Sequence, residues 1–95
     1  MIRRLLLLLS GVTEKASRFG PGSGFFRGRR EFAHFHSATE IDLRLTRRVI
    51  RTLPKDWRLV RRKTASDWIA FKVRRRSDAR VACALARLAW ELARS

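Results

Sequence analysis

The stretch WIAFKVRRRSDARVACALARLAWEL, residues 68–92, carries the strongest structural pattern of this 95-residue chain. Its second half has a helical period. Ser77 and Asp78 suit a helix start, and an apolar stripe then recurs at spacings of three and four. The stripe consists of Val81, Ala84, Leu85, Leu88 and Leu92. We therefore predict a helix from Ser77, with small residues beside the stripe that would let it lie close to a sheet or another helix.

The first half of the stretch has a different period. Ile69, Phe71 and Val73 alternate with smaller or polar residues, and Trp57 and Leu59 flank an arginine in the same way upstream. A period of two with β-branched and aromatic residues favours strands. We predict an antiparallel hairpin of residues 57–63 and 68–75 with a turn at 64–67. A helix that begins at Ser66 is the alternative, because Ile69 and Val73 are also four residues apart.

Residues 38–53 are predicted to form another helix. Ser37 and Glu40 have the spacing of a capping box, Asp42 adds negative charge to the first turn, and Pro54 would end the helix. Its apolar row is Ile41, Leu45, Val49 and Leu53. Together these elements predict an α+β fold in the form of a small α-β-β-α unit. An all-α fold of three helices is the alternative.

The glycines suggest a division of the chain. All five lie between residues 11 and 28. We therefore divide the chain into a flexible or helical leader with a Gly-rich segment, residues 1–32, and a small basic domain, residues 33–95. Within the leader, apolar residues at spacings of three and four predict a helix over residues 2–19.

This leader resembles a mitochondrial presequence, since it is basic, amphipathic and poor in acids. The segment Arg30-Glu31-Phe32-Ala33 resembles the mitochondrial processing motif, which has an arginine three residues before the cut and an aromatic residue just before it. The resemblance implies cleavage before Ala33 and a location in the mitochondrial matrix. A secretory signal and an uncleaved surface helix are the alternatives.

Composition narrows the class of protein. The formal net charge is +15, yet 45% of the residues are hydrophobic, which is too many for an ordinary disordered polyelectrolyte. One cysteine and two histidines exclude a disulfide framework and a structural zinc held by four Cys or His ligands. No apolar run approaches the roughly 18 residues that a membrane-spanning helix needs.

The basic residues of the second part form three groups, and 19 of the 23 basic residues in the chain are arginines. Guanidinium groups bind phosphate in a bidentate manner and stack on bases, and exposed tryptophans could add stacking platforms, so we predict RNA as the partner. The predicted RNA-binding residues are a helical stripe of Arg44, Arg47, Arg48 and Arg51, and two clusters at one end of the hairpin, Arg61, Arg62 and Lys63 with Arg74, Arg75 and Arg76. A solvated helix face is the alternative interpretation of each group.

The sequence contains no recognisable catalytic constellation. Cys83 lies beside the apolar stripe of the last helix and is expected to be a core residue, and His34 and His36 have no further ligands nearby in the sequence. The glycines lie in the leader, so they form no phosphate-binding loop of the later domain. We expect no enzyme, no cofactor, no metal and no small-molecule substrate.

These observations lead to one functional hypothesis. We predict a mitochondrial matrix protein that binds RNA phosphates as an accessory subunit of the mitochondrial ribosome, in contact with neighbouring proteins of that complex. Two alternatives stay open. One is a structural subunit at the inner membrane that contacts anionic lipid, and the other is an open reading frame without selected function.

Overall fold

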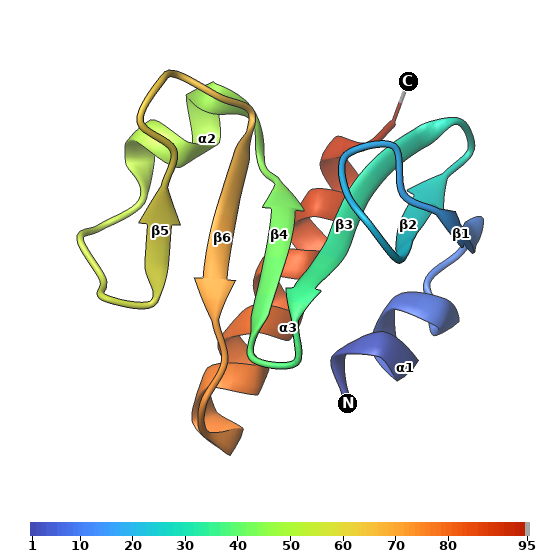
Figure 1. Cartoon of the computed structure of the whole chain (residues 1–95), viewed down its shortest axis with the longest axis horizontal. Helices are drawn as coiled ribbons and strands as arrows, with labels where there is room; N and C mark the ends of the chain where they lie inside the picture. The colour runs from blue at the N-terminus through green and yellow to red at the C-terminus, as the bar shows by residue number, and fades with distance from the viewer. Residues whose placement is uncertain (95) are drawn as a thin grey trace.

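The computed structural model describes residues 1–94, which form three helices and one six-stranded antiparallel sheet, so the predicted α+β class is confirmed (Figure 1). In chain order the elements are α1 (Ile2–Leu8), β1 (Val12–Ala16), β2 (Ser23–Arg27), β3 (Arg30–Ser37), β4 (Glu40–Arg44), α2 (Thr46–Thr52), β5 (Leu59–Arg61), β6 (Trp68–Lys72) and α3 (Arg76–Leu92).

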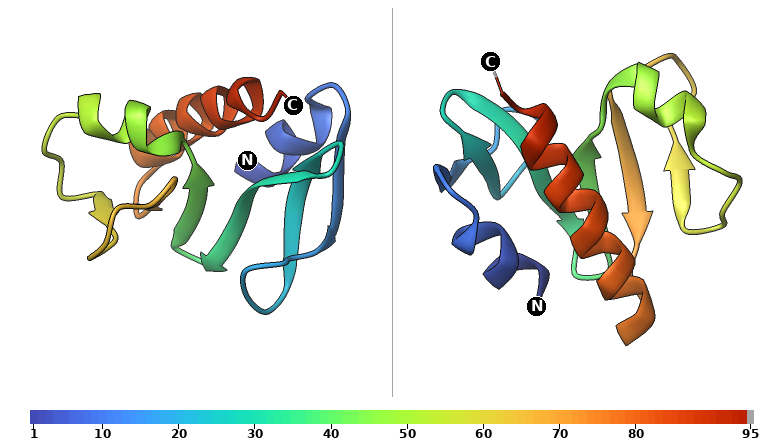
Figure 2. Two further views of the ribbon diagram at one scale, coloured as in Figure 1. Left: turned by 90° about the horizontal axis from the view of Figure 1, so that it is seen from above. Right: turned by 180° about the vertical axis from the view of Figure 1, so that it is seen from behind.

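The strands lie in the order β1-β2-β3-β4-β6-β5, so the first four follow the chain and β6 is inserted between β4 and β5. All three helices lie on one side of this sheet (Figure 2). Figure 1 looks onto the opposite side, which we call the open face. The two sides of the sheet therefore have different environments, one packed against helices and one without them.

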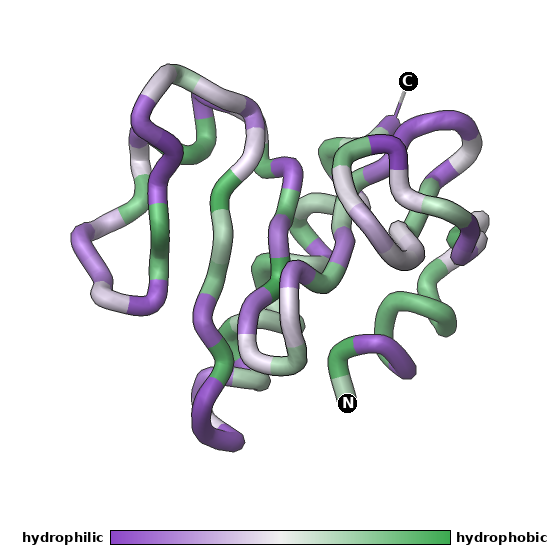
Figure 3. The backbone as a smooth tube through the Cα atoms, in the orientation of Figure 1, coloured by the Kyte–Doolittle hydropathy of each residue, from purple (hydrophilic) through white to green (hydrophobic). Residues whose placement is uncertain are grey.

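Strand β4 illustrates how the sequence divides these two sides. Successive side chains of a strand point to opposite faces, and the hydropathy along β4 alternates accordingly (Figure 3). Ile41 and Leu43 are fully buried in the core that includes the alanines of α3. Glu40 and Asp42 line a pocket on the open face. The alternation thus supplies the core on one side and polar groups on the other.

The predicted C-terminal helix is confirmed, but it begins at Arg76 and uses a different face. Its buried residues include Ala82, Ala86 and Ala89, whereas Val81 is 37% exposed. The predicted stripe was only partly correct, since Leu85, Leu88 and Leu92 pack against the core whereas Val81 and Ala84 are exposed. The helix approaches the sheet through its smallest side chains instead. Alanines permit a close helix–sheet distance, and the leucines then pack at the flanks of the contact.

The predicted hairpin is also confirmed, with shorter strands. Leu59 pairs with Phe71 and Arg61 pairs with Ile69 in antiparallel register. The alternative helix from Ser66 is wrong, since the Ser66 hydroxyl accepts the N–H of Trp68 at 3.1 Å, at the first residue of β6.

The predicted helix over residues 38–53 is wrong in its first half. Residues 40–44 form β4, which pairs with β3 and β6, and only Thr46–Thr52 is helical. The Ser37 hydroxyl accepts the N–H of Thr39 at 3.2 Å in a tight turn, so Ser37 does not cap a helix. Pairing on both edges of β4 outweighs the local helical pattern, because it buries Ile41 and Leu43 completely.

The predicted helix over residues 2–19 is correct only up to Leu8, because Gly11 turns the chain with a φ of +73° and β1 follows. The first 32 residues share the sheet and the core with the rest of the chain. Ile2, Leu6 and Phe25 belong to the same buried cluster as Ile41. The predicted processing site lies within β3, where Phe32 and Ala33 are both fully buried. Cleavage there stays a prediction.

The start of α3 is held by two aspartates and one arginine. The Asp78 carboxylate accepts the backbone N–H groups of Arg74 and Arg75 at 3.0 and 2.9 Å. It also accepts a hydrogen bond from Arg58, whose guanidinium binds Asp56 as well. The N–H of Arg74 is the main cause of a lowered pKa at Asp78, and the Arg58 side chain lowers the pKa of Asp56 to about 2.

These pKa shifts predict how stability depends on pH. A carboxyl group whose pKa is lower in the folded state stabilises the fold above its ordinary pKa near 3.8, and loses this contribution as the pH falls toward about 2. We expect the free energy of unfolding, measured with urea, to fall between about pH 5 and pH 2. The Asp56→Asn variant should show a shallower fall, and Glu91→Gln, on the exposed side of α3, should behave like the natural sequence. Identical slopes in all three proteins would contradict the assignment.

Candidate functional site

A pocket of about 600 Å³ lies on the open face of the sheet. Residues of β3 and β4 line it together with the connection between β1 and β2 and the basic segment after β5. We call it the open-face pocket. Its lining includes His34, His36, Glu40, Asp42, Phe19, Arg62 and Lys63. The pocket therefore combines imidazoles, carboxylates and cationic side chains from segments that are distant in the sequence.

Three buried side chains form the innermost part of this site. His34 and Asp42 are direct cross-strand partners on β3 and β4, and Nε2 of His34 lies 2.8 Å from Oδ2 of Asp42. Nδ1 of the same ring lies 3.5 Å from Oε2 of Glu31, without hydrogen-bond geometry. All three residues are at most 5% exposed. An imidazole is thus enclosed between two carboxylates.

Glu31 also connects the β1–β2 segment to the open face. Its carboxylate accepts hydrogen bonds from the Ser17 hydroxyl at 2.6 Å and from the N–H of Arg18 at 2.7 Å. Gly24 makes room for this carboxylate, because a Cβ at that position would collide with it. The ring of Phe19 then packs on Trp68 at a centroid distance of 5.1 Å.

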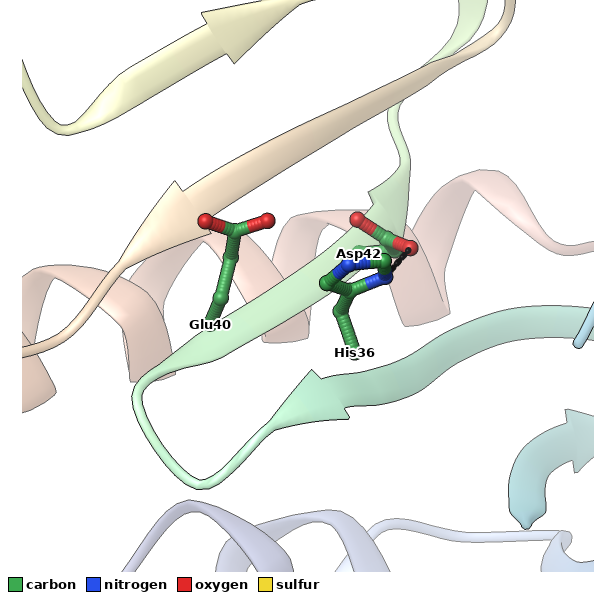
Figure 4. Close-up of side chains that lie close together, drawn as sticks. All are labelled: His36, Glu40 and Asp42. Carbon is green, nitrogen blue, oxygen red and sulfur yellow. Dashed lines mark ion pairs between the residues drawn. The ribbon is translucent and has the colours of Figure 1, made fainter. Parts of the chain in front are cut away.

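His36, Glu40 and Asp42 form a second polar cluster at the rim, where Figure 4 shows their side chains on the hairpin of β3 and β4. The register between these strands shifts between Phe35 and Ser37, so His36 occupies a β-bulge. Bulges often redirect a side chain next to a functional site. Nδ1 of His36 lies 3.8 Å from Oδ2 of Asp42, and one nitrogen or oxygen of each residue lies within 4.8 Å of the others. This is a donor set with which a metal ion could be bound.

The predicted basic residues gather in part at a second, smaller depression of about 220 Å³ between α2 and the segment after β5. We call it the basic groove. Its cationic lining consists of Arg47, Arg51, Arg61, Arg62 and Lys63, and Ile50 and Trp68 supply apolar surface. Arg62 and Lys63 line both this groove and the open-face pocket, so the two depressions are neighbours.

Two of the predicted basic residues are engaged within the fold. Arg44 is only 20% exposed and binds Asp67 at 3.3 Å. Arg61 donates to the carbonyl groups of Ile50 and Leu53 at the C-terminal end of α2, where a positive charge also complements the helix dipole. All other members of the first two groups are exposed, namely Arg47, Arg48, Arg51, Arg62 and Lys63.

The third predicted group lies elsewhere. Because β5 and β6 are antiparallel, the segment after Arg61 is at the turn end of the hairpin, whereas residues 74–76 follow the other end of β6. The prediction that both clusters share one end was wrong. There the Arg74 guanidinium lies over the exposed ring of Trp57 at 5.3 Å, and Arg75 and Arg76 are exposed.

Sequence reasoning missed the pairing of the histidines with carboxylates. Two signals were present. His34 and His36 are spaced as on one face of a strand, and Gly24 of β2 is the cross-strand partner of His34. Neither signal could be interpreted without knowledge of the register between β3 and β4, which places His34 opposite Asp42. Cys83, in contrast, packs against the core as predicted, and burial raises the pKa of its thiol.

Comparison with known proteins yields one match. The sequence profile described as the Luciferase domain matches residues 29–89, which extend from the turn before β3 to near the end of α3. This range includes His34, Asp42 and the basic groove, and leaves α1, β1 and β2 outside. No curated protein and no solved structure matches the chain. Within residues 1–94, no helix has the length and apolar character required to cross a bilayer.

Proposed function

We propose that this chain, which belongs to the Luciferase domain family, binds RNA phosphates through the basic groove. The name of the family does not identify a reaction or the residues that would carry it out. We therefore base the proposal on the basic groove. The observation that carries it is the convergence of exposed Arg47, Arg51, Arg62 and Lys63, which come from two segments of the chain, around one depression.

Few acidic groups oppose these cations. Asp67 is the acidic partner at this end of the sheet, and it is already bound by Arg44 and by the backbone N–H of Arg47. Nε of Arg47 lies 4.0 Å from the same carboxylate, at the limit of an ion pair. The cationic groups of Arg51, Arg62 and Lys63 take part in no ion pair among the described residues. They are therefore available to an anionic partner.

An exposed aromatic ring adjoins these cations. Phe19 is 61% exposed and lines the open-face pocket together with Arg62 and Lys63. Bases stack on aromatic side chains with a gain of about 1–3 kcal/mol each. The groove would contact the phosphates, and Phe19 would stack on an unpaired base. Because only single strands expose base faces, we expect the chain to prefer single-stranded to double-stranded RNA.

The salt dependence of binding tests this proposal. The affinity of the full chain for a single-stranded RNA oligonucleotide is measured by fluorescence anisotropy at increasing salt concentrations. Each phosphate contact contributes about −0.7 to the slope of log K against log salt. The double variant Arg62→Gln, Lys63→Gln should bind about tenfold more weakly near physiological salt and flatten the slope by about 1.4.

A variant of equal charge serves as the control. Arg4 and Arg80 are exposed on α1 and α3, on the helical side of the sheet, so Arg4→Gln, Arg80→Gln should leave the slope almost unchanged. An equal effect of the two double variants would show that only the net charge matters. Binding to vesicles of anionic lipid without binding to RNA would favour the membrane alternative.

The proposed setting is the mitochondrial ribosome in the matrix, with this chain as an accessory subunit. The arginine-rich composition and the resemblance of the first residues to a presequence support it. Sedimentation of the native protein from gently lysed mitochondria, with and without ribonuclease, tests the setting. Migration with ribosomal particles that is lost after ribonuclease treatment is expected, and the intact mass of the protein in those fractions shows whether residues 1–32 are retained. Migration with membranes that is insensitive to ribonuclease would contradict it.

A further inference from the structure

We propose that His36, Glu40 and Asp42 bind a divalent transition-metal cation, with Zn²⁺ as the best fit, at the rim of the open-face pocket. This site adjoins Arg62 and Lys63, which line the same pocket, but the proposal does not depend on RNA binding. Three features support a metal site: the donor atoms, the buried groups behind them and the local charge.

The three donors are brought together by one hairpin. His36 lies on β3, and Glu40 and Asp42 lie two residues apart on β4, so both carboxylates project from the same side of the strand (Figure 4). The candidate ligand atoms lie within 4.8 Å of one another. Ligands at about 2.1 Å from a tetrahedral zinc are about 3.4 Å apart. Because the His36 side chain is 64% exposed and Glu40 is half-buried, small side-chain rotations can close this difference.

Asp42 is oriented from behind by a buried histidine. Nε2 of His34 lies 2.8 Å from Oδ2 of Asp42, whereas Oδ1 of Asp42 takes part in no ion pair among residues 1–94. Ligating carboxylates in metal sites are commonly held by outer polar groups, which fix the direction of the free lone pairs, and His34 is close enough to take this part. The arrangement therefore has the inner ligand and the outer support that a metal site needs.

The same histidine carries a polar atom that the protein does not satisfy. Nδ1 of His34 is buried and has no hydrogen-bond partner among the described residues, although Oε2 of Glu31 is only 3.5 Å away. Buried polar groups are nearly always hydrogen-bonded, so this nitrogen is expected to gain a partner. It faces Glu31 and not the three donor atoms. Once a cation binds the Asp42 carboxylate, a small shift of the His34 ring would bring Nδ1 within hydrogen-bond distance of Glu31.

Negatively charged residues gather at this site, although the chain as a whole is strongly positive. Three of the eight acidic residues, Glu31, Glu40 and Asp42, gather at this place in a protein of net charge +15. Glu40 takes part in no ion pair within residues 1–94, even though Lys72 is its cross-strand partner on β6. Neighbouring carboxylates repel each other, and a bound cation removes this repulsion.

The donor types select the class of metal. One imidazole nitrogen with two carboxylates suits Zn²⁺ or Mn²⁺, and leaves at least one position for water or a ligand that enters the pocket. Ca²⁺ requires six to eight oxygen ligands, and Mg²⁺ prefers an octahedral set of oxygens. Arg62 and Lys63 line the same pocket, so an anion bound there would lie near the metal.

Titration of the full chain, freed of any histidine tag and of RNA, tests the proposal. Zn²⁺ binding is measured by calorimetry, and Co²⁺ serves as a probe because its visible spectrum reports a site with nitrogen and oxygen ligands. One equivalent of Zn²⁺ is expected to bind. His36→Ala and Glu40→Gln should each weaken binding by at least about tenfold.

The controls separate ligation from folding and from charge. Glu91→Gln removes an exposed carboxylate of α3 and should leave the affinity for Zn²⁺ unchanged. Both His36→Ala and Glu40→Gln alter side chains that are not fully buried, and their thermal unfolding without metal should match that of the natural chain. Absence of Zn²⁺ binding at millimolar concentrations, or binding unaffected by both variants, would overturn the proposal. Loss of the Zn²⁺ site with normal RNA affinity would leave the proposed RNA function intact.

Discussion

A fragment of residues 33–95 is expected not to fold. It lacks α1, β1, β2 and the first residues of β3, and with them the buried side chains of Ile2, Leu6, Phe25 and Phe32. The remaining 63 residues keep the basic character of the chain, and a unit of this size is marginal even with a complete core. Removal of β2 would also expose the edge of β3, which is paired with β2 in the intact sheet.

Circular dichroism during a thermal scan measures this effect. The full chain should unfold cooperatively, and the fragment should show no transition at the same concentration and salt. The result bears on the predicted processing site, since a protease could reach the bond between Phe32 and Ala33 only before β3 forms. A cooperative transition of the fragment would instead show that residues 33–95 are an independent domain.

The substitution Phe71→Ala is expected to cause a large loss of stability. The Phe71 side chain is 1% exposed on β6, between β4 and β5, and the Arg58 guanidinium lies 5.2 Å from its ring centre. Removal of a buried phenylalanine ring costs about 3–5 kcal/mol because a cavity remains. A domain of this length is stabilised by about 5–14 kcal/mol in total, so this loss is a substantial part of the whole.

Urea denaturation followed by tryptophan fluorescence gives the free energy of unfolding for this comparison. Val81→Ala is the control, because Val81 is 37% exposed on α3 and its truncation should cost well under 1 kcal/mol. A loss below about 1 kcal/mol for Phe71→Ala would mean that the core closes around the missing ring, which the interdigitated packing of protein interiors rarely permits.

The prediction of α3 succeeded because its signals are local. Asp78 satisfies N–H groups of residues only three and four positions away, and a helix satisfies its backbone within one segment. The hairpin of β5 and β6 is local in the same sense, since its strands are separated by a short turn. Such elements can be inferred from spacing, even when the buried face of the helix differs from the expected one.

The prediction for residues 40–44 failed because two patterns coexist there. Ile41 and Leu45 are four residues apart, as in a helix, whereas Ile41 and Leu43 alternate with acids, as in a strand. β3 and β6 pair with this segment on its two edges, and these partners decide in favour of a strand. The same holds at the N-terminus, where Gly11 interrupts a helical pattern and β1 pairs with β2.

In the candidate sites, too, some features could be inferred from the sequence and others depend on the tertiary structure. The exposure of the arginines at positions 47, 48, 51 and 62 could be inferred from the sequence, because charged side chains are seldom buried. That Arg44 and Arg61 bond to groups of the protein itself could not be inferred, since their partners Asp67 and Leu53 are brought near them only by the tertiary structure.

The charge, the α+β class and the elements whose hydrogen bonds are local could be derived from the sequence alone. Three features depend on the whole fold: residues 1–32 complete the sheet, β4 is a strand, and His34 lies opposite Asp42. The physical reason is that strand pairing and register depend on backbone partners outside the segment. A shift of one residue between β3 and β4 would send His34 to the other face of the sheet.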